Sequence, residues 1–219
     1  MPAPRLIVFD WDGTLVDSVA HIVRCLQSAS RDAGLPEPDD AAARDVIGLG
    51  LAQTFARLFP EGASRDQLER MATAYRDHYL AGGADVGAPF PGVGELLEDL
   101  RIQGFRLAVA TGKSYAGLSR AFAQTGLGDF FETIRCADER LSKPDPLMLR
   151  EVLAETGVQH TEALMVGDSV HDLDMARAAS VGGIGVTSGA HDAARLRTCE
   201  PLACLAGVND LRGWLGPRV

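Results

Sequence analysis

Lysine is scarce in this chain of 219 residues. Lys113 and Lys143 are its only lysines, so the other basic residues among the 21 are arginines. With 30 acidic residues the formal net charge is −9, which opposes binding to polyanions, and we therefore expect neither a nucleic acid nor a membrane as partner. A phosphorylated ligand would need a local cationic site, so each lysine that falls in a motif is informative.

Cysteine motifs and long apolar runs are missing as well. The four cysteines are scattered without a CxxC pair, which argues against a disulfide framework or a zinc site: Cys25, Cys136, Cys199 and Cys204. No apolar run approaches the length that spans a membrane, and residues 1–4 leave no room for a signal peptide before the first apolar run. These features predict a cytoplasmic protein, and they assign no oligomeric state.

Short apolar runs alternate with helical patterns along most of the chain. The runs are rich in branched residues and predict buried strands at residues 5–10, 105–111, 133–137, 163–168 and 183–187. Helical periodicity lies between them at residues 114–126, 145–157 and 170–180. This alternation predicts an α/β fold, in which a Rossmann-like parallel sheet carries helices on both faces.

Residues 17–88 interrupt the alternation, because they have helical periodicity and no convincing strand. Val19, Ile22 and Leu26, for example, fall on one helical face. The glycine-rich residues 82–89 then predict a linker back to the sheet. The sequence therefore predicts two domains, an α/β core of residues 1–16 and 89–219 and an all-helical domain of residues 17–88 inserted into it.

Polar residues follow the predicted strands at the point where each strand ends. Asp10, Thr111 and Asp168 close three apolar runs, and Lys143 precedes a predicted helix. Each alone could be a helix cap or a loop cation. Parallel sheets, however, bind ligands beyond the carboxyl ends of their strands, and carboxylates gathered there repel by about 4 kcal/mol per close pair. A cation is then required, and from the oxygen ligands we infer Mg²⁺.

Four motifs occur in a fixed order at these junctions. They are DWDGT at residues 10–14, TGK at 111–113, SKP at 142–144 and GDSVHD at 167–172. The set resembles the haloacid dehalogenase-like (HAD) superfamily over nearly the whole chain. The helical segment, together with FPGV at residues 90–93, is similar to the small helical cap of the phosphoglycolate phosphatase-like branch of that superfamily.

The resemblance implies a Mg²⁺-dependent phosphomonoester hydrolase that acts on a small phosphorylated metabolite, with 2-phosphoglycolate as the leading candidate. A carboxylate is a nucleophile without prior deprotonation, so Asp10 is expected to attack phosphorus and form an aspartyl-phosphate. Asp12 is expected to protonate the leaving group and then to deprotonate water. Thr111, Gly112 and Lys143 are the predicted phosphate-binding residues.

The metal ligands come from the same motifs. Asp168 is expected to bind Mg²⁺, and the resemblance implies that Asp10 and the backbone carbonyl of Asp12 complete the protein ligands. Asp172 is expected to orient Lys143 or a metal-bound water. The glycine-containing residues 47–51 lack a preceding strand, so they do not predict a nucleotide site. They form either a turn between helices or a loop that contacts substrate.

Two alternatives remain open. A sugar phosphomutase of the β-phosphoglucomutase type shares the core motifs and carries a histidine at the start of its cap. His21 lies one residue, or about 100° of helix, from the aligned position, which counts against this function. The alternative from another class is a phospho-accepting signalling or binding protein without turnover. In a receiver domain the acceptor closes the third strand, whereas Asp10 closes the first.

Overall fold

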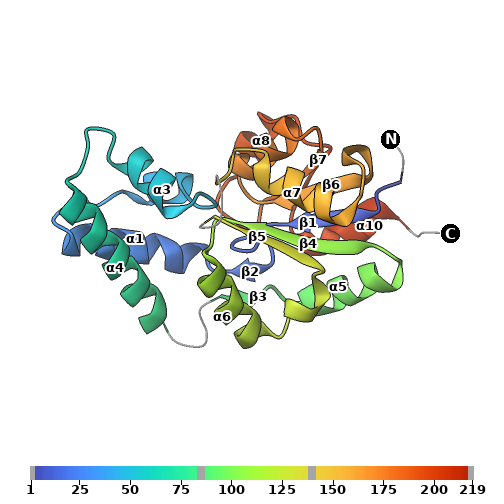
Figure 1. Ribbon diagram of the computed structural model, residues 1–219, viewed down its shortest axis with the longest axis horizontal. Coiled ribbons are helices and arrows are strands. Elements are labelled where there is room, and N and C mark those ends of the chain that lie inside the picture. Colours follow the sequence, from blue (N-terminus) through green and yellow to red (C-terminus); the bar gives the residue numbers. More distant parts are fainter. Residues whose placement is uncertain (1–2, 83–86, 138–141, 217–219) are drawn as a thin grey trace.

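The protein is built on one central parallel sheet (Figure 1). The computed structural model describes residues 3–82, 87–137 and 142–216, and it confirms the predicted α/β fold. The sheet order is β5-β4-β1-β6-β7-β8, and all neighbouring strands are parallel. The strands are β1 (Leu6–Phe9), β4 (Arg106–Thr111), β5 (Thr133–Cys136), β6 (Ala163–Gly167), β7 (Gly182–Val186) and β8 (Ala203–Leu205). The order reverses at β1, where such sheets place ligands.

Helices cover both faces of the sheet. On one face, α7 (Leu147–Thr156) and α8 (Val170–Ala178) pack against Leu6 and Val8 of β1. On the other face, α5 (Val93–Ile102), α6 (Tyr115–Thr125) and α10 (Leu211–Leu215) pack against Ile7 and Phe9. Successive side chains of a strand point to opposite faces, and both faces are covered here. That is why the first strand is a continuous apolar run in the sequence.

The remaining helices of residues 17–88 form a separate cluster, seen at the left of Figure 1. They are α1 (Val19–Asp32), α2 (Asp40–Asp45), α3 (Leu51–Leu58) and α4 (Arg65–Ala81), and we call residues 19–81 the helical insert. The insert has its own apolar core, which includes Val23, Leu26, Phe55 and Met71.

Two short strands join the helical insert to the sheet. β2 (Val16–Asp17) pairs antiparallel with β3 (Ala88–Pro89), so the chain enters and leaves the insert at one place. The predicted boundaries at residues 16/17 and 88/89 fall on this pair. The division into two domains stays a prediction, and residues 83–86 of the predicted linker lie outside the described residues.

Some elements were not predicted from the sequence. β8 has only three residues, all of them partly exposed, so it forms no apolar run that marks a buried strand. Helix α9 (Ala193–Arg197) has five residues. Three residues each form the 3-10 helices Gly128–Phe130, His160–Glu162 and Val208–Asp210. Among the described residues, no helix is both long and apolar enough to cross a membrane.

Candidate active site

Three carboxylates meet at the carboxyl edge of the sheet. Asp10 and Asp168 follow the neighbouring strands β1 and β6, and Asp172 lies in the first turn of α8. Their candidate ligand oxygens lie within 4.8 Å of one another, and all three side chains are buried. Asp172 is held there by Ser169, whose hydroxyl donates to Asp172 Oδ2 at 2.6 Å. The strand order and the start of one helix thus force three acids together.

Lys143 lies against this cluster and is fully buried. Its Nζ is 2.7 Å from Asp10 Oδ1 and 2.6 Å from Asp172 Oδ1. Burial lowers the pKa of Lys143, but the two carboxylates outweigh burial and the net shift is upward. Burial raises the pKa of Asp10 well above its usual value, although Lys143 opposes the shift. One cation therefore does not fully compensate these acids.

Asp168 is the third acid and has different partners. Thr14 Oγ1 donates to its Oδ1 at 2.8 Å, and the Ala190 N–H donates to its Oδ2 at 2.7 Å. A Cβ atom at Gly13 or Gly189 would collide with this carboxylate, so the glycines leave the room that it occupies. Burial, followed by repulsion from Asp172, raises the pKa of Asp168 to about 7. Excess buried negative charge on oxygen ligands fits a hard divalent cation.

The carboxylate of Asp12 lies apart from the three-acid cluster. Its Oδ1 accepts hydrogen bonds from Ser18 Oγ at 2.6 Å and Lys113 Nζ at 2.9 Å, and its Oδ2 accepts from Lys113 Nζ at 2.8 Å. Lys113 also donates to the Tyr79 hydroxyl, from α4 of the insert, at 2.9 Å. Sequence reasoning missed Ser18, Tyr79 and Lys113 as site residues. The rarity of lysine and the TGK motif were signals for Lys113.

Thr111 and Gly112 lie at the end of β4, next to β1. Thr111 is buried, and its Oγ1 accepts from the Lys113 N–H at 3.3 Å. A Cβ on Gly112 would lie 2.5 Å from the Gly48 carbonyl oxygen, so the loop of residues 47–51 rests directly on Gly112. In the same loop, the Gly50 N–H donates to Ser142 Oγ at 2.7 Å. This loop contacts the candidate site as well as joining two helices.

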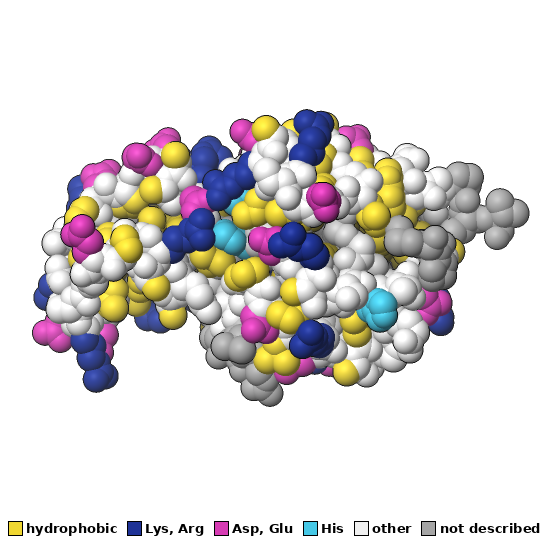
Figure 2. Space-filling view, turned by 90° about the horizontal axis from the view of Figure 1, so that it is seen from above, with side chains coloured by type: hydrophobic (Ala, Val, Ile, Leu, Met, Phe, Trp, Pro, Cys, Tyr) yellow, Lys and Arg dark blue, Asp and Glu magenta, His cyan; other side chains and the backbone are white. Residues whose placement is uncertain are grey.

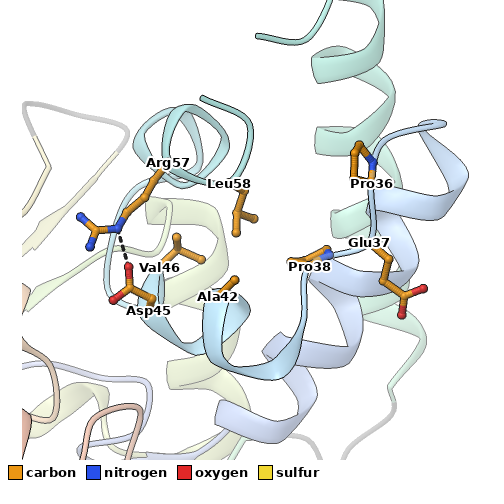
Figure 3. Close-up of a pocket in the computed structure, with 8 residues that line it drawn as sticks. All are labelled: Pro36, Glu37, Pro38, Ala42, Asp45, Val46, Arg57 and Leu58. Carbon is orange, nitrogen blue, oxygen red and sulfur yellow. Dashed lines mark hydrogen bonds and ion pairs between the residues drawn. The ribbon is translucent and has the colours of Figure 1, made fainter. Parts of the chain in front are cut away.

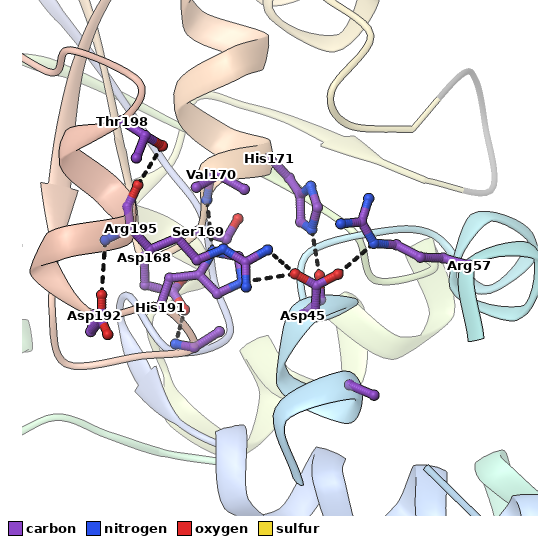
Figure 4. A network of polar contacts seen from close by, with 12 residues as sticks. Asp45, Arg57, Asp168, Ser169, Val170, His171, His191, Asp192, Arg195 and Thr198 are labelled. Atoms are coloured by element: carbon purple, nitrogen blue, oxygen red, sulfur yellow. Dashed lines mark hydrogen bonds and ion pairs between the residues drawn. The ribbon is translucent and has the colours of Figure 1, made fainter. Parts of the chain in front are cut away.

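A second contact joins the insert to the described residues outside it, which we call the sheet domain (Figure 4). The Asp45 carboxylate, at the end of α2, pairs with Arg57 Nε of α3 at 2.5 Å and with Arg195 of α9. The backbone oxygen of Asp45 lies 2.7 Å from His171 Nε2, and Asp45 Oδ1 lies 4.0 Å from His191 Nε2. We call these five residues the Asp45 contact.

Both histidines of the Asp45 contact are neutral near pH 7, because burial lowers the pKa of each to about 4. A neutral His171 with its proton on Nε2 donates to the Asp45 carbonyl oxygen. His171 also precedes Asp172 in the GDSVHD motif. The Asp45 contact thus connects the insert to the end of β6 and the first turn of α8, a segment that carries two of the clustered acids.

Figure 2 views the molecule from above and shows basic and histidine side chains where the insert meets the sheet domain. A separate pocket of about 260 Å³ opens in the insert (Figure 3). It is lined by Pro36, Glu37, Pro38, Ala42, Asp45, Val46, Arg57 and Leu58. None of the predicted site residues lines this pocket. The candidate active site therefore lies elsewhere, where the insert meets the sheet.

Comparisons with known proteins agree with this architecture. The family model for haloacid dehalogenase-like hydrolases matches residues 7–186. A protein named probable phosphatase IndB from Dickeya dadantii is 37% identical over 214 residues, which cover 95% of this chain and 92% of that protein. A phosphoglycolate phosphatase from Caulobacter vibrioides is 38% identical over 188 residues, or 84% of this chain and 79% of that protein. The crystal structure of a predicted phosphoglycolate phosphatase from Haemophilus somnus superposes with a TM-score of 0.85 at 25% identity, covering 96% and 97% of the two chains.

Proposed function

Since the chain belongs to the haloacid dehalogenase-like hydrolase family, we propose that it is a Mg²⁺-dependent phosphomonoester hydrolase in which Asp10 forms an aspartyl-phosphate. One observation carries the proposal. Asp10 is a buried carboxylate directly after the central strand, and its Oδ1 lies 2.7 Å from the buried ammonium of Lys143. A nucleophile in this position has a cation beside it to offset repulsion from a phosphate.

In the first half-reaction an Asp10 carboxylate oxygen attacks phosphorus and the bond from phosphorus to the ester oxygen breaks. Asp12 donates its proton to the departing oxygen, so the alcohol leaves neutral. The Thr111 hydroxyl and the Gly112 N–H lie at the end of the neighbouring strand, where they would bind phosphoryl oxygens. Lys143 would neutralise part of the charge on the phosphoryl group.

In the second half-reaction Asp12 accepts a proton from water, and the water oxygen attacks phosphorus. The bond between phosphorus and the Asp10 oxygen breaks, which releases inorganic phosphate and restores the carboxylate. Asp12 Oδ1 already accepts from Ser18 and Lys113, whereas Oδ2 accepts from Lys113 alone among the described contacts. Oδ2 is therefore the oxygen that we assign to proton transfer.

The residues present fit a magnesium ion. Asp10 and Asp168 would bind it together with the backbone carbonyl of Asp12, and Asp172 would hold Lys143 in place through their 2.6 Å contact. The raised pKa values of Asp10 and Asp168 support this assignment, because a cation would offset the charge that burial and mutual repulsion disfavour. When bound, Mg²⁺ supplies charge neutralisation at the phosphoryl oxygens.

For the substrate we propose a small phosphorylated metabolite, with 2-phosphoglycolate first because relatives named phosphoglycolate phosphatase match most of the chain. We further propose that the insert acts as the cap of the site, with domain boundaries at residues 16/17 and 88/89. The four free cysteines suit the cytoplasm, which is the proposed location.

Hydrolysis of p-nitrophenyl phosphate with and without Mg²⁺ tests the proposed function. Activity should require the metal, and Asp10→Asn should abolish it, whereas Asp66→Asn, the same change on the exposed side of α4, should not. Turnover that persists in Asp10→Asn would refute the mechanism. A panel of phosphorylated metabolites then tests the substrate, and isomerisation of a hexose 1-phosphate to its 6-phosphate would indicate the phosphomutase instead.

A further inference from the structure

Each aspartate of the DWDGT motif has its own lysine. Lys143 pairs with Asp10, and Lys113 pairs with Asp12 at 2.8 Å with only 9% of the lysine side chain exposed. These are the only two lysines of the chain. The proposed function uses Lys143 to offset charge but gives Lys113 no role. Lys113 is nevertheless the lysine that contacts Asp12, the proposed general acid and base.

The hydrogen bonds of Lys113 restrict what it can do. An ammonium group has three N–H donors, and the Lys113 Nζ lies within 2.9 Å of three oxygens: both carboxylate oxygens of Asp12 and the Tyr79 hydroxyl. The Nζ also lies 4.6 Å from the centroid of the Tyr79 ring, within the range of a cation–π contact. All three donors are thus engaged, which leaves none for a substrate group and favours a role in holding Asp12.

The residues around Asp12 come from three separate segments. Lys113 follows β4 in the sheet domain, Tyr79 belongs to α4 of the insert, and Ser18 precedes α1 where the chain enters the insert. The Asp12 carboxylate itself is bound by Ser18 and Lys113, and the insert reaches it through Tyr79, which accepts from Lys113. A movement of α4 away from the sheet would remove the Tyr79 hydroxyl from Lys113, and a turn of the chain at Ser18 would remove one of the two hydrogen bonds that Asp12 Oδ1 accepts.

We propose that Lys113 is a positioning residue, which fixes the Asp12 carboxylate for proton transfer and which Tyr79 holds in place only when the insert rests on the sheet domain. The proposal depends on the proposed function, because it assigns to Asp12 the proton transfers described above. Asp12 is then aligned when the insert covers the substrate and is released when the insert moves away. Proton transfer is thereby confined to the covered site.

Two aryl phosphates with different leaving groups test this role. p-Nitrophenolate is a weak base and leaves without being protonated. Phenolate is a stronger base, so its departure depends on a proton from the enzyme. In Lys113→Met, kcat for phenyl phosphate should fall by about 100-fold, the lower range of general acid–base effects, with little change in KM. With p-nitrophenyl phosphate the first step should survive and the second should slow. Stopped-flow measurement should then show a burst of p-nitrophenolate stoichiometric with enzyme.

A double-mutant cycle separates positioning from a general structural effect. If Lys113 acts through Asp12, the variant Asp12→Asn/Lys113→Met should be no slower than Asp12→Asn alone. Fully additive losses, or equal losses with both esters and no burst, would overturn the proposal. The proposed function fails by a different result, namely activity that is absent from the wild type or retained in Asp10→Asn.

Tyr79→Phe tests the contribution of the insert and keeps the ring in place. Loss of one hydrogen bond should lower kcat for phenyl phosphate about fivefold and produce a weaker burst with p-nitrophenyl phosphate. This variant also keeps the proposal testable if Lys113→Met does not fold. Tyr75→Phe is the matched control on the same helix, because the tyrosine hydroxyl that accepts from Lys113 among the described contacts is that of Tyr79. Unchanged kcat in Tyr79→Phe would refute the coupling to the insert.

Discussion

Replacing Lys143 by methionine should destabilise the folded protein, and more strongly at high pH than at low pH. Lys143 is fully buried and pairs with Asp10 and Asp172 at 2.7 and 2.6 Å. Methionine has a similar length and no charge, so the substitution leaves two buried carboxylates without their cation. Unlike a loss of activity, this loss of stability does not depend on any assumption about the reaction.

The expected loss in the free energy of unfolding follows from the burial of the ion pair between Lys143 and its carboxylates. Removing one partner of a buried ion pair costs about 3–5 kcal/mol. For a chain of this length about 2–4 °C of Tm corresponds to each kcal/mol, so Tm should fall by about 6–20 °C. Lys113→Met is the matched control, because Lys113 pairs with a single carboxylate that stays partly accessible. The fall in Tm of this variant should therefore be smaller.

The pH dependence has a definite sign. Burial already raises the pKa of Asp10, and without Lys143 that pKa rises further. When the pKa of a carboxyl group is higher in the folded protein than in the unfolded chain, the folded protein keeps a proton that the unfolded chain has released. The contribution of this group to the free energy of unfolding is then lost as the pH rises through the folded pKa. The loss of stability in the variant should therefore be smaller at about pH 5.5 than at about pH 8.

Urea unfolding of wild type and variant in the absence of Mg²⁺ measures the effect at both pH values. The variant Asp10→Asn/Lys143→Met should regain part of the stability, because one of the unpaired charges has gone. An equal loss at both pH values would contradict the electrostatic cause. A variant as stable as the wild type at about pH 8 would contradict the buried ion pair itself.

Three further outcomes are expected. Mg²⁺ should raise Tm more at about pH 8 than at about pH 5.5, because Asp168, with its pKa of about 7, must release its proton to bind a metal; equal shifts in thermal scans would contradict this. Gly112→Ala should lower kcat/KM at least about tenfold, since its Cβ meets the Gly48 carbonyl, whereas Gly94→Ala, in open space on α5, should not. Arg195→Gln should raise KM about fivefold with kcat retained, because it removes the charged sheet-domain partner of the Asp45 carboxylate. The exposed Arg197→Gln controls for it, and an unchanged KM would refute a role in holding the insert.

The sheet and the acids at its edge could be predicted because their signals are local. β1 and β6 are buried on both faces and so leave continuous apolar runs in the sequence. Asp10 and Asp168 follow those runs directly, and parallel pairing brings them together. Lys143 was predicted from its motif and from its rarity. The assigned roles of these residues stay predictions until the variants are measured.

The contacts between the insert and the sheet domain could not be predicted in the same way. Lys113 and Tyr79 lie 34 residues apart, and His171 and Asp45 lie 126 apart. No periodicity relates such pairs, since their contact depends on how α2 and α4 rest on loops of the sheet domain. The edge strand β8 was missed for a different reason. It has three half-exposed residues, and a run of that length is also typical of a loop.

The seclusion of both lysines has a practical consequence for anyone who handles this protein. Amine-reactive dyes and crosslinkers usually react with many lysines on a protein surface, but both lysines of this chain lie in the site, and such reagents leave arginine unmodified. Both ε-amino groups are engaged with carboxylates in the interior. Acylation of Lys113, followed by peptide mass spectrometry, would therefore test whether the insert moves away from this lysine, without any label having to be engineered.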